Sequence, residues 1–202
     1  MRFLYILEHL ITGIEMLLSN FCRIWDNALS NEVCDKFITL YNENSDLLER
    51  LEQNHYPCLT QLDFTKHKEL DSKLHDYMIE HAFACLGLYK NVVKEARFWP
   101  EKFSFENFRI KHYKEGGHDR FDEHVDSCNY DSSKRFFSFF WYLNDVEKGG
   151  ETEFTNLGIK IEPKKGRLLT FPPLWMFPHT GNPVIKGEKY ILHTYLHYDQ
   201  RY

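Results

Sequence analysis

Three polar residues in the second half of the chain have the types and spacing of a metal site. His124 and Asp126 are two positions apart, and side chains two apart on a strand point to the same face. A third ligand must come from elsewhere, and His179 is the candidate. Two histidines and one carboxylate form the facial triad that binds non-haem Fe(II) and leaves coordination positions open. The pattern therefore predicts a redox-active metal centre.

A lysine ten residues after His179 suits a ligand bound beside that metal. If His179 begins the penultimate strand and Lys189 begins the last, the ammonium group reaches inward next to the metal. There it would pair with the distal carboxylate of a ligand that chelates the metal from its other end. Tyr142 can add a hydroxyl to the same carboxylate, in a charge-assisted hydrogen bond.

The elements that must position these residues differ between the two halves of the chain. In the first half, Ser30 is a good N-cap for a helix carrying Phe37 and Tyr41 on one side, and a second long helix is expected over about 67–87. The segment 54–63, which contains Pro57, is expected to be an irregular connection.

After residue 100 the segments become short, aromatic and β-branched, and turn residues divide them. The run from Phe136 to Tyr142 has aromatics on both faces and is expected to be a central strand. Many short strands without intervening helices favour a sandwich, barrel or jelly roll. The expected strands are 105–113, 135–144, 159–162, 167–171 and 189–198.

Composition narrows the function classes further. The 202 residues carry a formal net charge of −5 with no basic run, which argues against a nucleic-acid partner. Five cysteines without a CxxC motif predict a reducing, cytoplasmic location. Apolar residues between Phe3 and Phe21 recur at helical spacing, and acidic residues interrupt them. We expect an amphipathic helix over 1–23 rather than a membrane span, either packed on its own domain or forming a homodimer.

The order and spacing of several further motifs resemble a known family. They are the segment from Tyr142 to Asn144, the turn from Gly149 to Thr152 with Phe154, and the run from Pro163 to Phe171. Together with the metal-site pattern, residues of about 105–198 resemble the catalytic core of the 2-oxoglutarate- and Fe(II)-dependent dioxygenases, in the prolyl 4-hydroxylase-like branch.

The resemblance implies an α+β protein built on a double-stranded β-helix, or jelly roll, with N-terminal helices packed on one sheet. Residues 24–202 would form a single dioxygenase domain, with helical support over about 24–100 and the jelly-roll core over about 101–200. The metal ligands would be His124, Asp126 and His179. The cosubstrate 2-oxoglutarate would meet Lys189, Tyr142 and Tyr113.

The implied activity is hydroxylation of an unactivated C–H bond with Fe(II), 2-oxoglutarate and O2, supported by ascorbate. The substrate would be a peptide, with proline as its target, or a small molecule such as a free amino acid. Arg135 and Tyr195 are candidate substrate contacts; Tyr195 shares the strand parity of Lys189. Two alternatives remain: a metal enzyme that does not use 2-oxoglutarate, and a non-catalytic metal-binding jelly roll.

Overall fold

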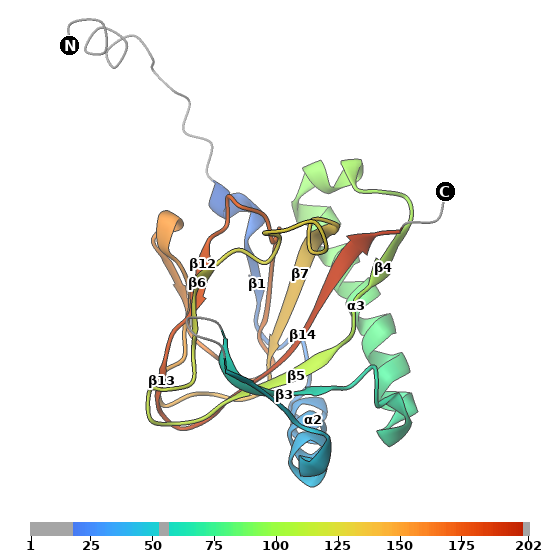
Figure 1. Cartoon of the computed structure of the whole chain (residues 1–202). Helices are drawn as coiled ribbons and strands as arrows, with labels where there is room; N and C mark the ends of the chain where they lie inside the picture. Colours follow the sequence, from blue (N-terminus) through green and yellow to red (C-terminus); the bar gives the residue numbers. More distant parts are fainter. Residues whose placement is uncertain (1–17, 53–56, 200–202) are drawn as a thin grey trace, which may run out of the picture.

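The computed structural model describes residues 18–52 and 57–199 of the chain. Within these ranges the protein is mostly antiparallel β-sheet, with two α-helices placed outside the largest sheet (Figure 1). The helices are α2 (Asn31–Glu43) and α3 (Ser72–Val92). This architecture is consistent with the jelly-roll-like α+β fold expected from the sequence.

The largest sheet has the strand order β1-β11-β7-β14-β5-β3-β2, with β4 pairing with β14. The two long strands β7 and β14 lie side by side at its centre. Its strands are β1 (Arg23–Trp25), β2 (Glu49–Glu52), β3 (Cys58–Asp63), β4 (Phe103–Phe105), β5 (Arg109–Tyr113), β7 (Arg135–Tyr142), β11 (Leu168–Phe171) and β14 (Lys189–Tyr198).

A second, four-stranded sheet has the order β10-β9-β12-β6, and β13 pairs with β8 in a short ribbon. These strands are β6 (Phe121–His124), β8 (Lys148–Gly149), β9 (Thr152–Phe154), β10 (Ile159–Ile161), β12 (His179–Gly181) and β13 (Val184–Lys186).

Side-chain caps fix where the two helices begin. The Ser30 side chain accepts a hydrogen bond from the backbone N–H of Val33 at 3.4 Å, as predicted. Asp71 accepts from the N–H of Leu74 at 2.9 Å, so α3 begins at Ser72 rather than at the expected residue 67. A 3₁₀ turn, Lys68–Leu70, occupies the difference.

The side chains of β7 divide the core into two layers. Phe137 and Trp141 pack in a cluster with helix residues such as Phe37 and Tyr89, so the helices cover one face of the largest sheet. Phe140 and Tyr142 point the other way, into a second cluster that includes residues of the smaller sheet. The expectation of a central strand with aromatics on both faces is confirmed, because β7 lies between β11 and β14.

The structure corrects three local expectations. The segment 54–63 is not a simple connection, because Cys58–Asp63 forms β3 between β2 and β5. The expected strand 105–113 is two strands, β4 and β5, which pair with successive parts of β14. His179 does not begin the penultimate strand, because β13 intervenes between β12 and β14.

The predicted helix over 1–23 falls mostly outside the described residues. Its described end is a 3₁₀ turn, Leu18–Phe21, followed by β1 from Arg23. Neither helix in the described part of the chain has the length and apolar character needed to cross a bilayer.

Candidate functional site

The three predicted metal ligands converge at the end of the smaller sheet. β6 ends at His124, and β12 begins at His179, directly opposite it in the strand register. Asp126 follows β6 by two residues, so it lies just past the strand rather than on it. Asp126 Oδ1 is 3.4 Å from His124 Nε2, and Asp126 Oδ2 is 3.7 Å from His179 Nε2. One ligand atom from each residue lies within 4.8 Å of the others.

Backbone carbonyls orient both imidazole rings. His124 Nδ1 lies 2.8 Å from the carbonyl oxygen of Asp122, and His179 Nδ1 lies 3.1 Å from that of Phe177. A carbonyl only accepts, so each Nδ1 carries the proton and donates it. This tautomer presents the Nε2 lone pair to the centre of the triad, which is the arrangement of metal-binding histidines.

The electrostatics of the triad also suit a cation. Among the described residues, Asp126 Oδ2 and His179 Nε2 are buried atoms without a hydrogen-bond partner. Burial lowers the pKa of His179 to about 4, so the ring is neutral near pH 7. Burial alone would raise the pKa of Asp126, but the nearby His179 and His124 hold it well below its usual range. A carboxylate and two imidazole rings aimed at one point fit a divalent metal ion.

Tyr195 and Arg135, the two candidate substrate contacts, both lie against Asp126. The Tyr195 hydroxyl donates a hydrogen bond of 2.5 Å to Asp126 Oδ1. The Arg135 guanidinium stacks 4.1 Å from the centroid of the Tyr195 ring and donates to the Asp126 carbonyl oxygen at 3.1 Å. Sequence reasoning missed this supporting contact with Asp126.

A narrow cavity lies on one side of the triad, and Lys189 and Tyr113 line it. Lys189 begins β14 directly opposite Tyr113 on β5, and the residue is 2% exposed. The Lys189 Nζ atom is 4.9 Å from the centroid of the Tyr113 ring. Burial lowers the pKa of this ammonium group to about 7. A buried cation here would be stabilised by an anionic ligand.

Tyr142, which the sequence suggested as a direct contact of the cosubstrate, does not line this cavity. Its hydroxyl donates a hydrogen bond of 2.7 Å to Thr152 Oγ1, and Thr152 rather than Tyr142 lines the cavity. Thr152 belongs to a motif that signalled the family resemblance, yet its position in the cavity was not predicted.

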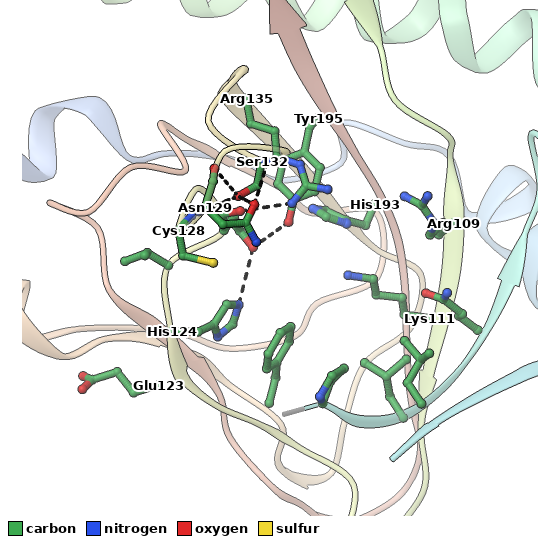
Figure 2. A pocket seen from close by; sticks show the side chains of 17 residues that line it. Arg109, Lys111, Glu123, His124, Cys128, Asn129, Ser132, Arg135, His193 and Tyr195 are labelled. Carbon is green, nitrogen blue, oxygen red and sulfur yellow. Dashed lines mark hydrogen bonds and ion pairs between the residues drawn. The ribbon is translucent and has the colours of Figure 1, made fainter. Parts of the chain in front are cut away.

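A larger cavity of about 690 Å³ opens on the other side of Asp126 (Figure 2). Arg135 and Tyr195 contribute to its wall, as do Arg109, Lys111 and His193. Lys111 lines both cavities. Sequence reasoning did not single out Lys111, although it shares the strand parity of Tyr113.

Comparison with known proteins gives a consistent result. Residues 108–197 match the family model of the 2OG-Fe(II) oxygenase superfamily. The chain is 33% identical over 141 residues to a protein described as probable prolyl 4-hydroxylase 9 of Arabidopsis thaliana. The aligned region covers 55% of this chain and 47% of the relative. The chain spans about half the length of the curated relatives it matches.

Solved structures agree with the fold. A viral collagen prolyl hydroxylase from Paramecium Bursaria Chlorella virus-1, in complex with 2OG, matches with a TM-score of 0.68 and 25% identity, over 90% of this chain and 98% of that one. A Trichoplax adhaerens prolyl hydroxylase, in complex with a hypoxia inducible factor peptide fragment, matches with a TM-score of 0.67 and 17% identity, over 90% and 87%.

Proposed function

We propose that this protein, a prolyl 4-hydroxylase-like 2OG-Fe(II) oxygenase by its residues 108–197, hydroxylates peptidyl proline. Its family implies Fe(II), 2-oxoglutarate and O2 as the reaction partners. The observation that carries the proposal is the pair of buried atoms Asp126 Oδ2 and His179 Nε2. Neither has a hydrogen-bond partner among the described residues, and both lie beside a cavity that Lys189 lines.

His124, Asp126 and His179 would hold the metal ion. The chemistry supplied by bound Fe(II) with O2 and 2-oxoglutarate is hydroxylation of an unactivated C–H bond, with 2-oxoglutarate converted to succinate and CO2. The chain itself keeps His179 neutral by burial and fixes the orientation of both rings through backbone carbonyls. Tyr195 holds Asp126 Oδ1, so Oδ2 remains available for the ion.

The narrow cavity, about 10 Å³ in this structure, would have to widen to bind 2-oxoglutarate. Lys189 would pair with its 5-carboxylate, because a cation buried among aromatic rings gains most from a charged partner. Tyr113 forms the neighbouring wall, and Tyr142 would act through the Thr152 hydroxyl that it contacts. Ascorbate would support turnover by keeping the iron reduced.

The larger cavity would receive the substrate. It shares Asp126 and His124 with the metal site, and Arg135 and Tyr195 line its wall. An open cavity of about 690 Å³ accommodates an extended peptide that crosses the site. The peptide complex of the Trichoplax adhaerens neighbour, which shares the fold, is compatible with this mode of binding.

We further infer that the two larger sheets form the double-stranded β-helix of this family, as one domain over residues 24–202. A homodimer through residues 1–23 and a cytoplasmic location stay predictions.

The proposal is tested by incubating the protein with Fe(II), 2-oxoglutarate, ascorbate and a panel of proline-rich peptides. We expect formation of succinate and addition of one oxygen atom to a peptide, detected by mass spectrometry. The variant His179→Ala should lose both signals, because it removes one of three ligands. His67→Ala, outside the lining of both cavities, is the matched control and should keep them.

Two results contradict the proposal in different ways. Retained turnover by His179→Ala would remove this residue from the ligand set. Tight Mn(II) binding without 2-oxoglutarate consumption on any peptide or free amino acid would favour the non-catalytic metal-binding module.

A further inference from the structure

Lys111 occupies a position between the two cavities that the proposed reaction does not use. It lies on β5, where alternate residues Arg109, Lys111 and Tyr113 share one face. The strand register places it opposite Gln61 of β3 and Ile191 of β14, so it is flanked on both sides. Figure 2 shows its side chain extending from β5 into the larger cavity, across from His124.

The two guanidinium groups of this cavity already have acidic partners. Arg109 Nε lies 3.6 Å from a carboxylate oxygen of Asp63. Arg135 forms a two-pronged pair with Glu106, at 2.8 and 2.9 Å. Their charges are largely offset within the protein.

Lys111 has no such partner among residues 18–52 and 57–199, where no carboxylate forms an ion pair with its ammonium group. Burial lowers its pKa to about 8, while Asp126 and Glu106 attract the charge from a longer distance. Most of the population is therefore charged near pH 7. Lys111 is half-buried, and a partly desolvated cation without an ion-pair partner is stabilised when a ligand supplies the anion.

Resting on the proposed function, we propose that Lys111 binds a carboxylate of the substrate next to the carbon that is hydroxylated. A single positive charge suits a monoanion. The distal carboxylate of 2-oxoglutarate is assigned to Lys189. The protein would therefore select acidic substrates.

Two sources could supply this carboxylate, and matched compounds distinguish them. One is an acidic side chain beside the target proline, tested with peptides that differ only by Glu or Gln at that position. The other is the carboxylate of a free imino acid, tested with L-proline against L-prolinamide. For whichever of these two compounds supplies the carboxylate, we expect the wild-type kcat/KM of the acid to exceed that of its amide by about 10- to 100-fold.

The variant Lys111→Met should reduce that ratio to about one while leaving the KM for 2-oxoglutarate unchanged, and Lys111→Arg should restore part of it. Lys73→Met, an exposed lysine on α3, is the control and should keep the wild-type ratio. Wild-type protein alone already tests the selectivity, so the experiment does not depend on how well a variant folds.

A second measurement separates this inference from the proposed function. Calorimetry without O2, with Mn(II) and 2-oxoglutarate present, compares the binding of each acid with that of its amide. Tighter binding of one acid, lost in Lys111→Met, supports the role of Lys111 even if no turnover occurs. Equal or absent binding of acid and amide in both pairs overturns it. A raised 2-oxoglutarate KM in Lys111→Met, with the acid preference intact, also overturns it and assigns Lys111 to the cosubstrate.

Discussion

The hydroxyl of Tyr195 fixes one oxygen of the carboxylate that would bind the metal. Its hydrogen bond to Asp126 Oδ1 measures 2.5 Å, and Oδ2 is left facing His179. A bond of this kind sets the orientation of a ligand and reduces the entropy lost when the metal binds. Tyr195 is therefore a positioning residue in our account.

We predict that Tyr195→Phe weakens Mn(II) binding about 10- to 100-fold, because it removes that bond. Calorimetry on the metal-free protein measures the affinity. Tyr190→Phe is a matched control, since its hydroxyl also donates to a carboxylate, that of Glu188, outside both cavities. An unchanged affinity for Tyr195→Phe would show that Asp126 needs no such support.

Burial of Lys189 makes stability depend on pH in a definite direction. Its pKa is lowered from 10.5 to about 7 in the folded protein, so above pH 7 the unfolded chain binds more protons than the folded one. The free energy of unfolding then rises with pH between these two values. In Lys189→Met this contribution is absent.

The expected result compares the variant with the wild type in denaturant, without metal or 2-oxoglutarate. The free energy of unfolding of Lys189→Met minus that of the wild type should be lower at about pH 9 than at about pH 6, by roughly 2 kcal/mol. Lys73→Met should follow the wild type at both pH values. A difference that does not change with pH would mean that the ammonium group is solvated.

The sequence singled out several residues that the structure brings together. His124, Asp126, His179 and Lys189 are all brought to one cavity, as predicted from their order and spacing. The contacts of Tyr195 and Lys111 were not predicted. Tyrosine is frequent in this chain, and one lysine in a strand has no signal of its own until the partners of its neighbours are known.

At the scale of elements, a tight turn joins the N-terminal segment to the sheets. Gly166 lies between β10 and β11 with a φ of +77°, and a Cβ atom there would lie 2.4 Å from the carbonyl oxygen of Leu29. The Gly166 carbonyl also accepts a hydrogen bond of 3.1 Å from the N–H of Leu29. Both the backbone conformation and the close approach require glycine.

Gly166→Ala should therefore lower the free energy of unfolding by about 1–3 kcal/mol. Gly87→Ala is the control, since it lies in α3 with no atom within 4 Å of the added Cβ. That control should raise stability by up to about 1 kcal/mol through helix propensity. Chemical denaturation measures both, and equal effects would contradict the account of the turn.

Elements were predictable where their own residues determine them. Ser30 and the aromatic run of β7 specify a cap and a central strand locally. β3 was missed because Pro57 suggested an irregular connection and because the polar residue Gln61 occupies a buried position, which hides the apolar alternation expected of a strand. Its conformation depends on pairing with β5, about 50 residues away, and a single stretch of sequence does not show that pairing.

For the whole molecule, binding at the site should be visible as stability. Mn(II) with 2-oxoglutarate at about 100 times their dissociation constants adds roughly 2.7 kcal/mol to the folded state. We expect Tm to rise by about 5–10 °C in a thermal scan. His179→Ala should lose this increase while His67→Ala retains it. An equal rise in His179→Ala would place the metal elsewhere.

The alternation of side chains along β14 constrains how the protein can evolve. Lys189, His193 and Tyr195 share one face of it, while Tyr190, Leu192 and Leu196 pack on the helix side. A single codon inserted before Lys189 would exchange the two faces, and would displace both Lys189, which we propose binds the cosubstrate, and the Asp126 contact of Tyr195. Lys111 is on a different strand and can be exchanged alone. We therefore expect descendants to acquire new substrates through β5, while β14 is inherited intact.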